Sequence, residues 1–366
     1  MKLEGGKISS SQLTFLIIGF TIGSSVILSP GQAAGHDAWL AVLAGLGEGL
    51  FFAVIYTSLA ARFPGKTLVQ FNDLIYGPYL GKVISIGYLW FFFHLGSLVL
   101  RNFGDFFTSI IYPETPMVVF ILLTALICAS ATRNGIEVIA RCSIILLSLM
   151  LVTDLVLIIL LLKDMEFTNL LPIFDLPLKE FIRASHSAAT FPFGETVAFL
   201  MVIAFLNNVK QAKISTAAAL TIAGMFLVTA SVRNTAVLGI VATTATYPSF
   251  MAVRIIDIAH ILTRLEVIVA IDLLAMGFLK ISVLYYGTVL GMAQLLKLRS
   301  YLPLVLPVGA LMVLLSILQF DSVTENIAFA FDIWPYYAIP FQIGIPLLSL
   351  IVAVLRGLPK KEGGSK

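Results

Sequence analysis

The stretch TFPFGET, residues 190–196, interrupts an otherwise apolar run that extends from residue 184 to residue 206. The run is long enough to cross a bilayer, since a transmembrane helix needs about 20 predominantly apolar residues. Its proline and glycine weaken the helix, and Glu195 places a carboxyl group at the same point. Unwound backbone is tolerated at membrane depth only where it is buried in protein or lines a cavity. The stretch therefore predicts a broken transmembrane helix beside a binding cavity.

The composition of the whole chain supports a membrane protein. Of its 366 residues, 59% are hydrophobic and only 12% are charged, whereas soluble domains average roughly 45–50% and about 25%. No cleavable signal peptide is expected, because the polar N-terminus leads directly into an apolar run without a convincing cleavage site. The apolar runs predict ten transmembrane helices, at residues 12–34, 39–61, 83–110, 117–131, 142–162, 184–206, 216–241, 265–293, 302–318 and 336–355.

A second break of the same kind lies in the first predicted helix, in the stretch TIGSSVILSPG at residues 21–31. Proline and glycine also kink membrane helices without any function, but two breaks at matched positions favour a site. The breaks are five helices apart, and an odd number of spans inverts the second half relative to the first. We therefore expect an all-α, single ten-helix membrane domain over residues 1–355, with inverted repeats at about 12–162 and 184–355 and a tail at 356–366.

Lys and Arg residues predict the orientation, because they gather on the cytoplasmic side of membrane proteins. With both termini in the cytoplasm, most of them fall inside, and only Lys163, Lys179, Arg183, Arg254 and Arg264 fall outside. Two outer connections are long, at 163–183 and 242–263, and the second contains a predicted amphipathic surface helix. The last outer loop, before residue 336, is acidic.

Several ionisable residues lie within the predicted helices and are candidates for function by default. Glu195 would hold part of a ligand, or would be protonated and cap freed backbone groups at the break. Arg101 and Asp105 lie four residues apart on one helix face and predict a structural ion pair. Arg233 is near enough to a helix end to reach the surface, and no role is assigned to it.

Lys280, near the middle of the eighth predicted helix, is the most informative cation. A buried ammonium group can take the place of a coupling ion in a transporter-like bundle. Alternatively, it forms a salt bridge with Asp154 or Glu48, which the sequence leaves open. Asp154 and Asp272 lie in the outer halves of their helices and predict a polar outward vestibule.

The sequence carries no signal of catalysis. It lacks the G-x-S-x-G, H-E-x-x-H, Walker A and dinucleotide-binding motifs, and its four His and two Cys are scattered. We therefore expect no enzyme activity, no metal site and no cofactor. The net charge of +3 gives no reason to expect a nucleic-acid partner.

A series of short motifs, in order along nearly the whole chain, resembles the B subunit of endospore germinant receptors, which are members of the amino acid–polyamine–organocation transporter superfamily. The motifs are IGSSVILSP (22–30), ARFPGKTL (61–68), VLRNFGDF (99–106), RNGIEVIAR (133–141), NLLP (169–172), FPFGE (191–195) and KISVLYYG (280–287). Each motif is weak alone, and their ordered combination is specific.

This resemblance implies a LeuT-like fold with a small-molecule pocket between broken helices 1 and 6 and neighbouring helices 3 and 8. The implied binding residues are Gly23, Ser24, Ser25, Ser97, Phe193, Gly194 and Glu195. Relatives usually have glycine where this chain has Ser25, so its hydroxymethyl group would narrow the pocket or supply a hydrogen bond.

The resemblance also implies partners and a place. These are a membrane-embedded A subunit and a lipoprotein C subunit, in the lipid of the spore inner membrane. The expected function is to sense a germinant, an amino acid before a sugar or nucleoside. The alternatives are a secondary transporter or part of an ion or water pathway.

Overall fold

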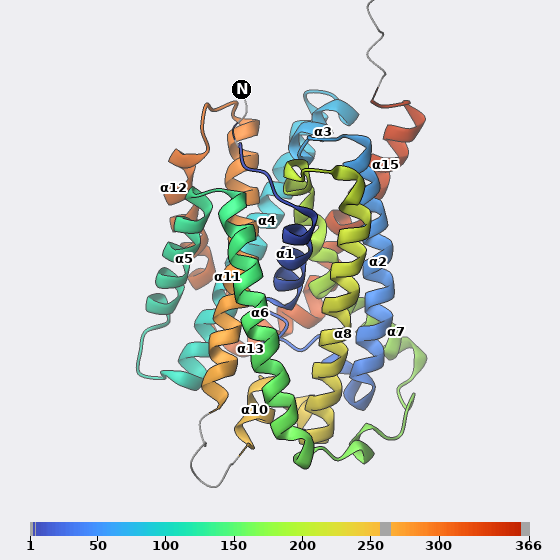
Figure 1. Ribbon diagram of the computed structural model, residues 1–366, viewed down its shortest axis with the longest axis vertical. Helices are drawn as coiled ribbons and strands as arrows, with labels where there is room; N and C mark the ends of the chain where they lie inside the picture. Colours follow the sequence, from blue (N-terminus) through green and yellow to red (C-terminus); the bar gives the residue numbers. More distant parts are fainter. Residues whose placement is uncertain (1–2, 4, 257–264, 360–366) are drawn as a thin grey trace, which may run out of the picture.

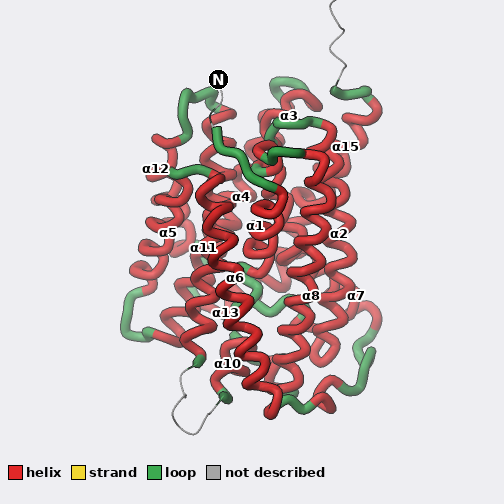
Figure 2. The backbone as a smooth tube through the Cα atoms, in the orientation of Figure 1, coloured by secondary structure: helices red, strands yellow, loops and turns green. Residues whose placement is uncertain are grey.

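The structure, a computed structural model, describes residues 3, 5–256 and 265–359. Helices dominate these residues, which contain no β-strand apart from an isolated bridge between Ile8 and Leu206 (Figure 2). The long helices run along one axis, and the described N-terminus and the end of α15 lie at the same end of the bundle (Figure 1). The α-helices are α1 (Ser10–Ile22), α2 (Ala38–Arg62), α3 (Leu68–Tyr76), α4 (Leu80–Phe106), α5 (Met117–Arg133), α6 (Ile136–Leu161), α7 (Leu178–Ala188), α8 (Ala212–Leu238), α9 (Val241–Thr244), α10 (Pro248–Arg254), α11 (Glu266–Leu295), α12 (Leu302–Leu318), α13 (Val323–Ala328), α14 (Trp334–Ile339) and α15 (Ile345–Leu355).

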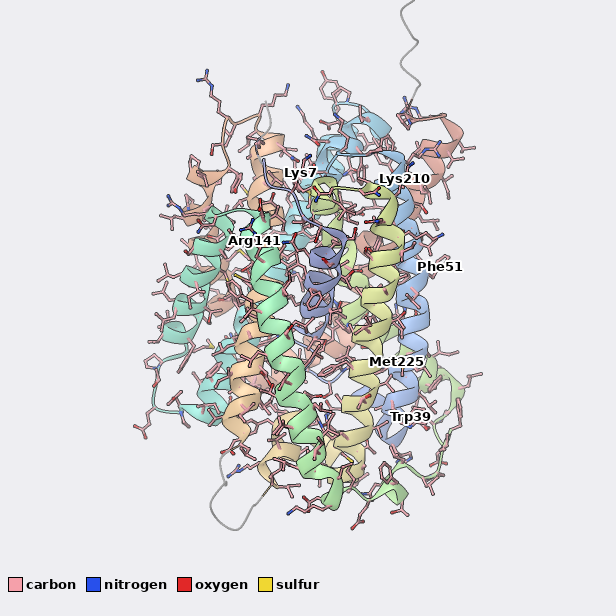
Figure 3. All side chains as sticks on the ribbon, in the orientation of Figure 1. Lys7, Trp39, Phe51, Arg141, Lys210 and Met225 are labelled. Atoms are coloured by element: carbon pink, nitrogen blue, oxygen red, sulfur yellow. The ribbon has the colours of Figure 1, made fainter. Side chains whose placement is uncertain are left out.

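The outer surface of the bundle is apolar along its middle, as a lipid-facing surface requires. Six described helical segments are long and apolar enough to cross a membrane, and three shorter apolar helices accompany them. Phe51 and Met225, each about half exposed, lie on outer faces, whereas Lys7 and Lys210 lie toward the end of the bundle where the chain begins (Figure 3). The chain is therefore an all-α integral membrane protein.

The predicted helices correspond to the observed ones with three differences. The tenth helical stretch begins at Val323 rather than at residue 336, so Glu325 and Asp332 lie in helical segments rather than in a loop. The sixth begins at Leu178, and α3 was not predicted. The predicted surface helix is represented by α10; the rest of that prediction, residues 257–264, and residues 360–366 of the predicted tail lie outside the described residues.

Because of the first break, only the first half of the predicted helix at residues 12–34 is a regular α-helix, α1. α1 ends at Ile22, where the N–H of Gly23 donates to the carbonyl of Gly19 at 2.9 Å. The chain then continues in turns, with the N–H of Ser25 bonded to Ile22 and that of Leu28 bonded to Ser24. Because α1 packs against α6, α8 and α11, its broken end lies in the middle of the bundle (Figure 1).

The second break replaces the α-helix between residues 189 and 205 by irregular and 3₁₀ turns. α7 is followed by η5 (Ala189–Phe193), in which Phe191 has non-helical φ and ψ of −131° and 111°, and by η6 (Gly194–Met201). Tyr56 of α2 donates its hydroxyl to the carbonyls of Gly194 at 3.1 Å and Gln342 at 2.5 Å. The Gln342 amide in turn donates to the Thr190 carbonyl at 2.9 Å. Freed backbone carbonyls at the break thus have partners, which apolar surroundings demand.

Substitution of Gly194 by alanine tests how tightly this break is packed. A Cβ atom at Gly194 would lie 2.1 Å from the side-chain oxygen of Gln342, so Gln342 must move and weaken its hydrogen bond to Thr190. We expect Gly194→Ala to lower the free energy of unfolding by about 1–3 kcal/mol, measured by thermal unfolding in detergent. Gly47→Ala is the control, because no atom lies within 4 Å of its added Cβ. Equal stabilities of the two variants would contradict the close packing.

Candidate functional site

An ion pair between α11 and the break of helix 6 forms the centre of the candidate site. Lys280 Nζ lies 2.5 Å from Glu195 Oε2, and both side chains are fully buried. Lys280 Nζ also donates a hydrogen bond to Ser24 Oγ at 2.8 Å, at the break of helix 1. One lysine therefore connects the two broken helices, which lie far apart in the sequence.

The surroundings of Lys280 are suited to a buried cation. Its Nζ lies 4.9 Å from the ring centroid of Phe191 and 5.4 Å from that of Phe20, within the range of a cation–π attraction. Gly23 makes the approach possible, since a Cβ atom there would lie 2.7 Å from Lys280 Cδ. Glycine is therefore required at this point of the first break because a larger residue would collide with the Lys280 side chain.

A small cavity borders this ion pair, and the free space between its atoms amounts to about 330 Å³ when open solvent is included. Its polar lining comes from Ser24, Asn102, Glu195, Asn326 and the indole of Trp334. Most of the remaining wall is apolar, from Leu28, Leu95, Leu98, Val99, Phe191, Phe329 and Ala330. Within the described part of the chain, Glu195 Oε1 and Trp334 Nε1 are buried without a hydrogen-bond partner. Buried polar atoms of this kind call for a partner. Because both residues line the cavity, these two atoms are its candidate acceptor and donor for a small molecule.

A hydrogen-bonded network joins α4 to α13 beside this cavity. Asn326 Nδ2 donates to Asn102 Oδ1 at 2.7 Å and to Asp105 Oδ2 at 2.9 Å. Asp105 accepts from Arg101 Nε at 2.8 Å, and both side chains of that pair are buried. Arg101 also donates to the carbonyl of Phe320 at 2.5 Å. The predicted Arg101–Asp105 pair is therefore part of a larger hydrogen-bond network. This network holds together α4 and α13, which both contribute to the cavity wall.

The residues implied by the resemblance divide into two groups. Ser24 and Glu195 line the cavity, whereas Gly23, Ser25, Ser97, Phe193 and Gly194 are not part of its lining. The hydroxyl of Ser97 bonds back to the Phe93 carbonyl at 3.0 Å, and that of Ser25 bonds to the Thr21 carbonyl at 3.0 Å. Both serines thus satisfy their hydroxyl groups within their own helix turn.

The partners expected for Lys280 are different in the structure. Asp154 pairs with Arg233 at 2.7 Å, and Glu48 lies 2.8 Å from His186 Nδ1, so neither is the partner of Lys280. The expectation that Arg233 reaches the surface is also wrong, because only 5% of its side chain is exposed. These helices turn Asp154 and Glu48 toward other neighbours, which spacing along the chain does not reveal.

Sequence reasoning missed the apolar wall of the cavity and three lining residues with polar side-chain atoms, and a signal existed for one of these three. Asn102 lies in the motif VLRNFGDF at residues 99–106, within a predicted helix. Asn326 and Trp334 lie before residue 336, in a stretch expected to be a loop because of its acidic residues. A tenth helix that begins earlier brings both of them to the cavity.

The fold is that of the LeuT-fold class of membrane proteins, and the solved structures that share it are transporters. The solved structure of MhsT in complex with L-phenylalanine covers 98% of this chain and 91% of its own, with a TM-score of 0.64 and 18% identity. The structure of Mhp1, described as a nucleobase-cation-symport-1 family transporter in a closed conformation with bromovinylhydantoin bound, covers 91% of this chain and 78% of its own. Its TM-score is 0.60 and its identity 14%. At these identities the likeness shows the fold alone.

Relatives by sequence narrow this class. The chain is 30% identical over 357 residues to spore germination protein KB of Bacillus subtilis (strain 168), with 96% of each chain covered. It is 24% identical over 365 residues to spore germination protein YndE of the same organism, covering 96% of this chain and 97% of that one. The family described as "Spore germination protein" matches residues 7–323. The chain belongs to this spore germination protein family.

Proposed function

We propose that the chain is the membrane subunit of a spore germinant receptor, which binds a small germinant at the two breaks and signals to partner subunits. The observation that carries the proposal is the contact of Lys280 with both Glu195 and Ser24, at the wall of a small cavity. A ligand that contacts Glu195 and Ser24 bears on both broken helices at once. It can therefore shift the balance between two arrangements of the bundle by binding one of them more tightly.

An amino acid is the ligand that the cavity chemistry supports best. Glu195 Oε1 is placed to accept from an ammonium group, and a charge-assisted hydrogen bond is among the strong ones. The Trp334 N–H is a donor for a carboxylate, and the leucine and phenylalanine wall suits an apolar side chain. Because Lys280 balances Glu195, a zwitterionic ligand adds no net charge to the buried site.

The proposal includes a place and an orientation. Lys7, Lys210 and Arg141 lie toward the end where the chain begins (Figure 3), which by the positive-inside tendency is the cytoplasmic end. Family resemblance supports the spore inner membrane as the location, with a membrane-embedded A subunit and a lipoprotein C subunit as partners.

Thermal stabilisation of the purified chain across amino acids, sugars and nucleosides tests the ligand. A ligand that binds the folded state raises its stability in proportion to the logarithm of concentration over Kd. We expect amino acids with apolar side chains to raise the melting temperature, and sugars and nucleosides to leave it unchanged. Uptake of the radiolabelled hit into proteoliposomes then separates the functions. A sensor retains no more label than one bound ligand per protein, whereas accumulation beyond that amount would assign the chain to transport.

Trp334→Phe tests the donor in the cavity. Phenylalanine keeps an aromatic ring but removes the indole N–H, so we expect the Kd for the stabilising amino acid to rise about 5- to 10-fold. Trp90→Phe is the matched control, because Trp90 is half exposed and lies outside the cavity lining. Binding that weakens equally in both variants would argue against a ligand hydrogen bond from Trp334.

A further inference from the structure

A second cavity lies on the other side of the helix 1 break. The free space between its atoms amounts to about 550 Å³ when open solvent is included, and its walls come from the chain after α1 and from α6, α8, α10 and α11. It shares no lining residue with the cavity at Glu195. Two consecutive residues of the helix 1 break line different cavities. Ser24 lines the cavity at Glu195, and Ser25 lines the second cavity.

The charges in this second cavity do not balance. Asp154 is neutralised by Arg233 at 2.7 Å, and Arg233 is held further by Asn234 Oδ1 at 3.3 Å from Nε. Only 6% of the surface of Asp272 is exposed. Within the described residues, Asp272 takes part in no ion pair. One of its oxygens, Oδ2, accepts a hydrogen bond from Thr153 Oγ1 at 2.6 Å. A buried carboxylate without a counter-charge is costly, so it calls for a proton or a cation.

The rest of the lining includes further side-chain oxygen atoms, which small cations favour as ligands. Hydroxyl-bearing residues come from three segments, with Ser25 and Ser29 after α1, Ser231 on α8 and Ser249 on α10. Oxygen ligands of this kind suit hard cations and ammonium groups rather than soft metals.

We propose that Asp272 and the hydroxyl groups around it form a separate binding site for a small monovalent cation, either an alkali-metal ion or a primary ammonium group. The site goes beyond germinant binding, because its lining is distinct from the cavity at Glu195. Lys280 does not line it, so this cation is additional to the lysine that bridges the two breaks.

Cation-dependent stability of the full-length purified chain tests the site. Melting temperatures are measured at constant ionic strength, with choline replaced stepwise by sodium, potassium or methylammonium. We expect a saturable rise for at least one of them in the unaltered protein. A response to sodium or potassium identifies an alkali ion, and a response to methylammonium alone identifies an ammonium ligand. Identical curves for all three cations and choline would overturn the proposal and leave Asp272 as a protonated acid.

Two variants locate the response. Asp272→Asn keeps the size but removes the charge, and it should abolish saturation or raise the apparent Kd at least about tenfold. Thr153→Val retains the carboxylate but removes its hydroxyl anchor, so a smaller rise in Kd is expected if Asp272→Asn does not fold. Glu48→Gln is the control with the same change of charge, because Glu48 pairs with His186 and lines neither cavity. If the melting temperatures of Asp272→Asn and Thr153→Val still saturate with cation at the Kd of the unaltered protein, the cation binds elsewhere. That result would overturn the assignment of the site to Asp272.

Discussion

Lys280→Met should be the most destabilising single substitution considered for this protein, with a loss of about 3–5 kcal/mol in free energy of unfolding. Methionine fills most of the lysine volume, but it leaves the fully buried Glu195 without its counter-charge at 2.5 Å and Ser24 without its donor at 2.8 Å. An uncompensated charge in apolar surroundings has no water to solvate it. The measurements are the yield of folded protein and its melting temperature in detergent.

A double variant separates charge imbalance from loss of packing. Replacing both members of a buried ion pair by apolar residues of similar volume is often close to neutral, so Lys280→Met combined with Glu195→Met should recover most of the lost stability. It should nevertheless fail to respond to any germinant, since the polar group at the cavity wall is gone. A double variant as unstable as Lys280→Met alone would show that the lysine acts through packing or through Ser24, not through Glu195.

The helical breaks could be predicted from sequence because their causes are local. Proline, glycine and serine in otherwise apolar runs weaken a helix wherever it is placed, so the breaks near Gly23 and Gly194 follow from the residues themselves. The apolar length of each run likewise fixes which segments can span a bilayer. The same argument identified Glu195 as a buried carboxyl group that needs a partner.

The identity of that partner could not be predicted, because it depends on how the helices are rotated and packed. Asp154, Glu48 and Glu195 were equivalent as carboxyl groups on apolar helices, and only tertiary contacts assign Lys280 to Glu195. Trp334 was missed for a related reason. Acidic residues before residue 336 lowered the local hydropathy, although Asn326 in this stretch is buried against Asp105 and Asn102.

Glu195→Gln should produce the largest loss of ligand binding at a modest cost in stability. The amide keeps the shape of the side chain and an oxygen that can accept from Lys280. The Lys280 ammonium also keeps Ser24 and the rings of Phe20 and Phe191, so the fold is retained better than in Lys280→Met. The ligand loses a charge-assisted hydrogen bond, worth about 1.5–3 kcal/mol, which corresponds to a Kd roughly 10- to 150-fold higher. The readout is the concentration dependence of melting temperature for the amino acid that stabilises the unaltered protein, together with germination of spores that carry the variant.

Glu48→Gln provides the matched comparison for this substitution. Glu48 is also a carboxylate within a transmembrane helix, but it pairs with His186 and does not line the cavity. We expect the Kd of Glu48→Gln to remain within about twofold of the unaltered value, since it makes no contact with the ligand. If Glu195→Gln binds and germinates as well as Glu48→Gln at equal protein levels, the germinant does not bind at Glu195. The buried ion pair would then serve only to hold the two broken helices together.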